Sequence, residues 1–137
     1  MDGGIWAMKL ERLMDMTKCL LIDSDNKGRR CLEQMLSGLG LETSLMAGAD
    51  DALRYCNDNS PEVVMLSANA RGVVPKELVK RLRFSVKGRP PVVFVYAERA
   101  DTGMFGQTIL EGAADVLMMP FDRDLLQFKL RQAGIIA

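Results

Sequence analysis

Short, unbroken runs of apolar residues recur along this chain of 137 residues, and each is followed by a stretch with helical spacing. The runs do not alternate apolar with polar residues, which is typical of strands that are buried on both faces. A strand–helix unit repeated in this way predicts an α/β fold, with a parallel sheet between two layers of helices. The expected strands are Lys18–Ile22, Glu42–Met46, Val63–Leu66, Val92–Tyr96 and Val116–Met118.

The segments between these runs carry signals for the start and the end of helices. Asp25 or Asn26, Asp101 and Asp122 can each cap a helix, because a short polar side chain accepts a hydrogen bond from a free backbone N–H. Pro75 suits the first turn of another helix. The expected helices are Lys27–Ser37, Asp50–Asn57, Pro75–Phe84, one from Asp101 to about Gly112, and a last one between Asp122 and Gly134.

Residues 1–16 form a separate segment ahead of a domain that spans residues 17–137. Trp6, Leu10, Leu13 and Met14 fall on one face of a helix, and charged residues fall on the other side. The segment is therefore expected to be an extra N-terminal amphipathic helix. Its apolar face either packs on the chain's own domain or binds a second chain, as in a homodimer, and the pattern leaves both open.

Composition excludes several classes of function. Eighteen basic and eighteen acidic residues cancel, so no overall charge draws the chain to DNA or to an anionic membrane. The chain has no histidine, which removes Ser-His-Asp and Cys-His catalytic pairs and the usual zinc ligands. Its longest apolar stretch is far shorter than the ~20 residues of a membrane helix.

The cysteines indicate the compartment. Cys19, Cys31 and Cys56 are odd in number and far apart, with no C-x-x-C pair among them. This pattern favours neither a disulfide framework nor a zinc site. We therefore expect buried free thiols in a cytoplasmic protein.

From about Thr17 to Ile135 the chain resembles the receiver domain of bacterial two-component response regulators. The landmarks are CLLIDSD at the first strand, PEVVMLS at the third, PPVVFVYA at the fourth and GAADVLMMPFD across the fifth. The resemblance implies a three-layer, flavodoxin-like fold whose five parallel strands have the order 2-1-3-4-5.

The same resemblance implies a phosphoryl-transfer pocket at the carboxyl ends of the strands. In the family, two acidic residues after the first strand and an aspartate ending the third bind Mg²⁺, and that aspartate accepts the phosphoryl group. A Thr or Ser ending the fourth strand and a Lys before the fifth-strand Pro contact the phosphoryl oxygens, and an aromatic residue in the fifth strand moves with them. The matching positions here hold Asp23 and Ser24, Ser67 as acceptor, Tyr96 for Thr or Ser, Met119 for Lys and Val116 for the aromatic residue.

These departures predict a pocket that is not phosphorylated. Asp23 is a single carboxylate where the family uses three, so affinity for Mg²⁺ should be very weak. No lysine neutralises phosphoryl oxygens, a serine without a base is a poor nucleophile, and Tyr96 is large enough to fill the hollow. We expect no metal, no cofactor and no catalytic residue, and so a pseudo-receiver that acts as a phosphorylation-independent signalling adaptor.

The resemblance implies that such an adaptor binds a signalling protein through the fourth helix, the fifth strand and the last helix. Met104 and Phe105, at the start of the fourth helix, are candidate anchors on that face. Trp6 and Leu10 in the N-terminal segment are candidates for a second interface.

Two alternatives remain open. Residues 71–89 are strongly basic, which favours a solvated surface helix but is also compatible with a module that binds an anionic nucleotide, such as a cyclic dinucleotide. The residues that would bind the anion are Arg71, Lys76, Lys80, Arg83 and Arg89.

The second alternative is a residual phosphotransfer domain that uses Asp23.

Overall fold

The computed structural model describes residues 16–137, which contain one five-stranded parallel sheet. The hydrogen-bonded strands lie in the order β2-β1-β3-β4-β5, as expected from the sequence. The strands are β1 (Lys18–Ile22), β2 (Glu42–Met46), β3 (Val63–Ser67), β4 (Val92–Ala97) and β5 (Asp115–Met118).

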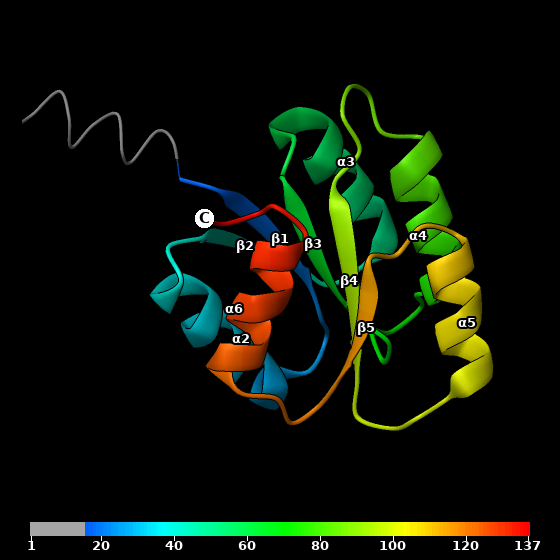
Figure 1. Cartoon of the computed structure of the whole chain (residues 1–137). Helices are drawn as coiled ribbons and strands as arrows, with labels where there is room; N and C mark the ends of the chain where they lie inside the picture. The colour runs from blue at the N-terminus through cyan, green and yellow to red at the C-terminus, as the bar shows by residue number, and fades with distance from the viewer. Residues whose placement is uncertain (1–15) are drawn as a thin grey trace, which may run out of the picture.

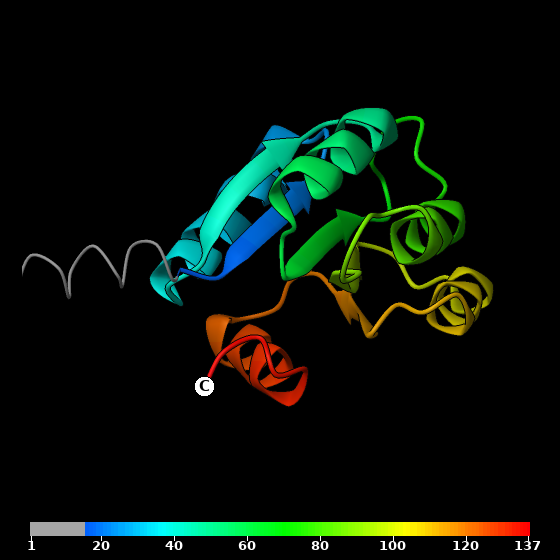
Figure 2. The same ribbon diagram turned by 90° about the horizontal axis from the view of Figure 1, so that it is seen from above.

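Helices cover both faces of the sheet. α2 and α6 lie on one face, and α3, α4 and α5 lie on the other (Figures 1 and 2). The N-terminal helix expected over residues 1–16 falls almost wholly outside the described residues, so that helix and the boundary at residue 17 stay predictions. The helices are α2 (Asn26–Gly38), α3 (Ala49–Asn59), α4 (Pro75–Phe84), α5 (Thr102–Leu110) and α6 (Arg123–Gln132).

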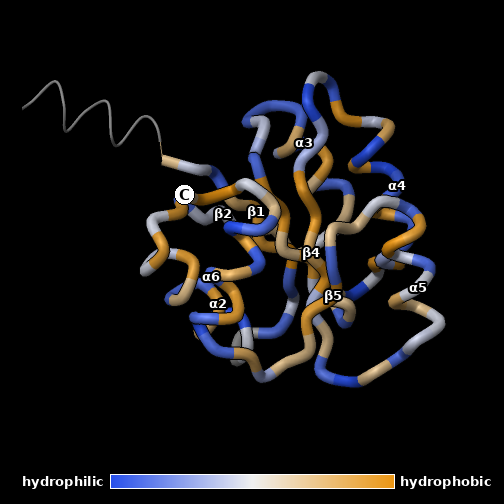
Figure 3. The backbone as a smooth tube through the Cα atoms, in the orientation of Figure 1, coloured by the Kyte–Doolittle hydropathy of each residue, from blue (hydrophilic) through white to orange (hydrophobic). Residues whose placement is uncertain are grey.

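Two hydrophobic clusters, one on each face, explain why the strands are apolar without alternation. In β1, Leu20 and Ile22 pack into the cluster under α3 and α4, while Cys19 and Leu21 pack into the cluster under α2 and α6. Successive side chains of a strand point to opposite faces, so both sets must be apolar when both faces are covered. Figure 3 shows the hydrophobic residues concentrated along the central strands.

The expected helix signals are confirmed at three helices. Asp101 Oδ1 accepts a hydrogen bond from the Met104 N–H at 3.0 Å, Asp122 Oδ1 accepts one from the Leu125 N–H at 2.8 Å, and Pro75 is the first residue of α4. α3 extends two residues beyond the expected end. It is terminated by Ser60, a residue other than glycine that adopts the left-handed conformation with a φ of 49°. α5 ends earlier than expected, at Leu110.

The cysteines correct one expectation. All three are free, and Cys19 and Cys56 are buried, but Cys31 is exposed. The expectation of buried thiols is therefore wrong for Cys31, because Leu32 and Leu36, four residues apart, form the buried face of α2. No helix between residues 16 and 137 has the length and apolar character needed to span a bilayer.

Candidate functional site

A small cavity lies at the carboxyl ends of β1, β3 and β4, where the sequence placed the candidate pocket. Its volume is about 30 Å³, enough for roughly one water molecule. Asp23, Ser67, Tyr96 and Met119 all line it, so the structure brings these four expected residues together. The lining also includes Asp25, Gly28, Asn69, Ala97 and Glu98, which the sequence had not assigned to the pocket.

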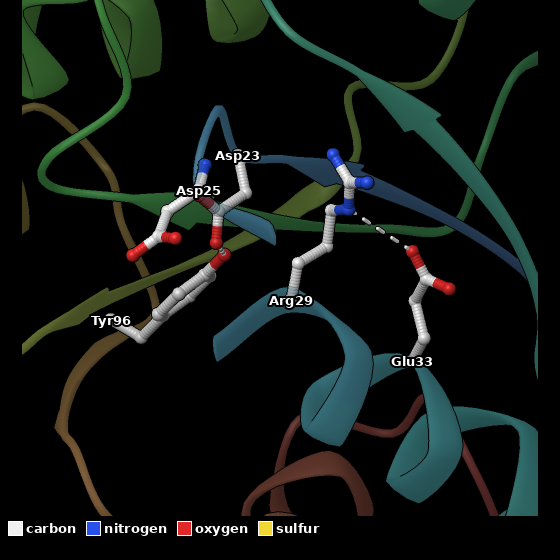
Figure 4. A network of polar contacts seen from close by, with 5 residues as sticks. All are labelled: Asp23, Asp25, Arg29, Glu33 and Tyr96. Carbon is white, nitrogen blue, oxygen red and sulfur yellow. Dashed lines mark hydrogen bonds and ion pairs between the residues drawn. The ribbon is translucent and has the colours of Figure 1, made fainter. Parts of the chain in front are cut away.

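A hydrogen bond between Tyr96 and Asp23 occupies the centre of this site. Both residues are buried, at 4% and 3% exposure, and the Tyr96 hydroxyl donates to Asp23 Oδ2 at 2.5 Å (Figure 4). The other carboxylate oxygen, Oδ1, accepts the backbone N–H of Asp25 at 2.8 Å. Both oxygens of the Asp23 carboxylate are therefore held by groups of the chain itself, in charge-assisted hydrogen bonds.

The environment of Tyr96 keeps its hydroxyl protonated. Burial raises the pKa of this phenol well above its ordinary value, and the hydrogen bond to Asp23 and the negative charge of that residue raise it further. A hydrogen bond with Ser67 acts in the opposite direction but does not reverse the shift. Tyr96 is thus a permanent donor to Asp23 at neutral pH.

The two serines make hydrogen bonds to loop backbone. Ser67 pairs with Tyr96 across β3 and β4, and its Oγ accepts the Asn69 N–H at 3.2 Å. Ser24 does not line the cavity; its Oγ accepts the Arg71 N–H at 3.1 Å and so joins the loop after β1 to the loop after β3. Both hydroxyls stabilise the local loop conformation.

Among the side chains that the structure describes, no Lys or Arg lines the cavity. Met119, which the resemblance matches to the family's lysine, lines the cavity, and its backbone N–H donates to Ala97 O at 2.8 Å. Arg29 on α2 is directed to Glu33, with 3.6 Å between Nε and Oε1 (Figure 4). Val116, at the switch position, packs against the cluster under α3 and α4.

The donor set does not fit the Mg²⁺ that the resemblance implies. Magnesium binds through several oxygen ligands and favours carboxylates. Within residues 16–137, no group of three or more Asp, Glu, Cys or His side chains is placed to hold a metal ion. The buried carboxylate of Asp23 already accepts hydrogen bonds at both oxygens.

The basic residues do not converge on one site. Arg83 Nη1 donates to Glu111 O at 3.5 Å, and its guanidinium lies over the Phe84 ring at 5.1 Å. Arg89 and Arg83 line two different cavities. Arg71 and Arg89 lie in the loops before and after α4, and the ten residues of that helix span about 15 Å between them. All five candidate anion-binding residues have exposed side chains: Arg71, Lys76, Lys80, Arg83 and Arg89.

Exposed apolar side chains occur on the elements around the sheet edge at β5, and Met104 and Phe105, the anchors expected from the sequence, are not among them. Met104 and Phe105, at the start of α5, are half-buried. β5 lies at the edge of the sheet beside α5 and α6 (Figure 1), and the Lys129–Asp115 ion pair joins α6 to β5. We call the exposed apolar residues of these three elements the edge surface; they are Ile109, Leu110, Met118, Leu125 and Phe128.

The sequence does contain a signal for part of the edge surface. Leu126 and Leu130, four residues apart, are the buried residues of α6. Leu125 and Phe128 fall on other faces of the helix than Leu126 and Leu130. The helical spacing therefore indicates that these two apolar residues lie outside the buried face.

Sequence comparison gives one curated relative. No family model matches the sequence. The transcriptional regulatory protein AfsQ1 of Streptomyces coelicolor is 24% identical over 116 residues, which cover 85% of this chain. The matched region is 50% of AfsQ1, so this chain spans about half the length of that relative.

Solved structures give the fold. A response regulator receiver domain from Bermanella marisrubri has a TM-score of 0.77 at 21% identity and covers 86% of this chain and 98% of its own. The receiver domain of the sensor histidine kinase PA1611 from Pseudomonas aeruginosa has a TM-score of 0.74 at 21% identity, covering 87% and 98%. A response regulator described for Chloroflexus aurantiacus has a TM-score of 0.76 at 24% identity, covering 88% and 98%. This chain therefore has the fold of a response regulator receiver domain.

Proposed function

We propose that this chain is a pseudo-receiver, a signalling adaptor that works by protein–protein contact without phosphorylation. The observation that carries this proposal is the buried hydrogen bond from the Tyr96 hydroxyl to Asp23. It supports the proposal because a bulky donor from the chain itself occupies the position that the resemblance assigns to metal and phosphoryl oxygens.

Phosphoryl transfer depends on positioning and on cations that stabilise the developing charge. The structure of the PA1611 receiver domain has a magnesium ion coordinated in its active-site cleft. In this chain the cavity is about 30 Å³, and its lining includes the acidic residues Asp23, Asp25 and Glu98; no Lys or Arg is among the lining residues whose side chains are described. Such a lining repels a phosphoryl group, and the acceptor position offers only the Ser67 hydroxyl.

The loss of the phosphoryl group has a consequence for signalling. A shift between two conformations requires a ligand that binds one of them better. In the family, the hydroxyl residue of the fourth strand moves together with the aromatic residue of the fifth. Here Tyr96 is held by Asp23, and Val116 is a small aliphatic residue that packs against the cluster under α3 and α4. The edge surface should therefore keep one conformation, and protein abundance should control partner binding.

The edge surface is the interface that we propose for the partner protein. Exposed apolar side chains mark protein contact sites when they form a patch, and a few large side chains supply most of the binding energy. Phe128, at 59% exposure, is the largest of the five. This role involves no catalysis.

Phe128→Ala should weaken binding of a partner protein by about 1–2 kcal/mol and leave the melting temperature almost unchanged. The physical reason is that the ring is exposed and contributes little to the core. Phe84→Ala is the matched control, because Phe84 is also an exposed aromatic residue, at 68%, but lies at the end of α4. Calorimetric titration of both variants checks the difference, and equal losses of affinity would place the interface elsewhere.

The proposal is tested by NMR spectra of backbone amides recorded with and without Mg²⁺ and beryllium fluoride, a mimic of the phosphoryl group. We expect the resonances of α5, β5 and α6 to stay in place, because both oxygens of the Asp23 carboxylate accept hydrogen bonds and no Lys or Arg among the described side chains lines the cavity to hold the mimic. Saturable shifts of those resonances would show a working switch and would overturn the proposal.

A further inference from the structure

We propose that the N-terminal segment binds in cis, with Trp6 inserted into a groove at the amino ends of β3 and β4. This groove lies at the opposite end of the sheet from the Asp23 pocket. Its volume is about 270 Å³, far more than one water occupies. Its apolar lining comes from Pro61, Pro90, Val92, Ala133 and Ile135.

The position at which the chain enters the sheet points to this occupant. The Lys18 N–H donates to Glu62 Oε2 at 2.6 Å, and the Glu62 N–H donates to Lys18 O at 3.0 Å. Glu62 itself lines the groove, and its carbonyl accepts the Val92 N–H at 3.0 Å. The residues that precede Lys18 therefore start beside the groove rather than at a distance from it.

The length of the preceding chain permits the contact. Trp6 lies twelve positions before Lys18, a separation that spans about 18 Å as a helix and about 40 Å when extended. The indole can thus return to a groove that begins at Glu62.

The chemistry of the groove suits tryptophan. An indole combines a large apolar body with one N–H donor, so it favours apolar cavities with an acceptor at the rim. Prolines and aliphatic side chains supply the apolar walls here, and the Glu62 carboxylate and the Ser60 hydroxyl supply acceptors. Leu10, on the same predicted helical face as Trp6, would cover the rest of the opening.

Trp6 is the only tryptophan of the chain, so its fluorescence reports on this contact directly. In the whole chain we expect emission shifted to the blue and several-fold weaker quenching by acrylamide than in the chain unfolded in urea. Ala133→Arg and Pro90→Arg each place a long charged side chain in the groove. Both variants should shift the emission to the red and restore quenching, whereas Ala100→Arg, an exposed site in the loop before α5, should not.

Circular dichroism checks that each variant is folded. Two groove variants are used so that the test still works if one of them does not fold. Tryptophan as accessible in the folded wild-type chain as in urea would overturn the proposal. Shielding that disappears on dilution, together with a dimer mass in sedimentation, would assign the groove to a second copy and would also overturn it. Neither result bears on the Asp23 pocket, so this inference can fail while the proposed function stands.

Discussion

Tyr96→Ala should lower the free energy of unfolding by about 3–5 kcal/mol, the usual cost of truncating a buried aromatic side chain. Tyr96 is 4% exposed and belongs to the cluster under α2 and α6, so its removal leaves a cavity. The change also leaves the buried Asp23 carboxylate without its hydroxyl donor, which adds a desolvation penalty. Urea denaturation measures the effect.

Two variants separate the ring from the hydroxyl. Tyr96→Phe keeps the ring and removes only the donor, so we expect a smaller loss, about 1–3 kcal/mol. Tyr55→Ala is the matched control, because the half-buried Tyr55 donates to Ser44 Oγ, a neutral partner, at 2.9 Å. A loss for Tyr96→Ala no larger than the loss for Tyr55→Ala would contradict the structural role assigned to Tyr96.

Wild-type stability should fall more steeply in alkali than the stability of Tyr96→Phe. Burial and Asp23 raise the pKa of Tyr96 in the folded state above its ordinary value of 10.0. The fold therefore favours the neutral phenol, whose contribution is complete below pH 10.0 and is lost as the pH rises above it. The stability difference between the two proteins should be constant below pH 10.0 and shrink above it.

The buried cysteines explain why the comparison needs the phenylalanine variant. Burial raises the pKa of Cys19 from 9.0 to about 12 and that of Cys56 from 9.0 to about 11. Their contributions are complete below pH 9.0 and are lost above it in both proteins. The contribution of Cys56 cancels in the difference, and that of Cys19 cancels except for its charge interaction with Tyr96, the last of the causes that shift the Tyr96 pKa. A difference that stays constant through the alkaline range would show that Tyr96 is not held by Asp23.

Most of the fold could be predicted from the sequence, because the apolar runs have a simple physical cause. β1 supplies Leu20 and Leu21 to opposite clusters, so it must be apolar at consecutive positions. Helix ends were less predictable where no cap or glycine signals them. α3 ends at Ser60 in the left-handed region, which serine rarely adopts; Pro61 signals a turn there but does not fix the last helical residue.

The candidate site was predictable as far as strand ends determine it. Asp23, Ser67 and Tyr96 meet because they follow or end neighbouring parallel strands. The positions of Asn69 and Glu98 depend on the loops after β3 and β4, whose conformations no periodicity encodes. The exposure of Phe128 was equally hidden, because an apolar helical residue is expected to be core until the buried face is known.

The measurement that tests the account most directly is the intact mass of the protein after incubation with acetyl phosphate and Mg²⁺. A receiver that carries the acceptor aspartate serves as the positive control. We expect the wild-type chain to stay unmodified. We expect the same of the Ser67→Asp variant, because its new carboxylate would lie beside Asp23 and Tyr96, with Met119 in place of the lysine. A stable phosphoryl adduct on Asp23 or Ser67 of the wild-type chain, or on the new aspartate of the variant, would contradict the account.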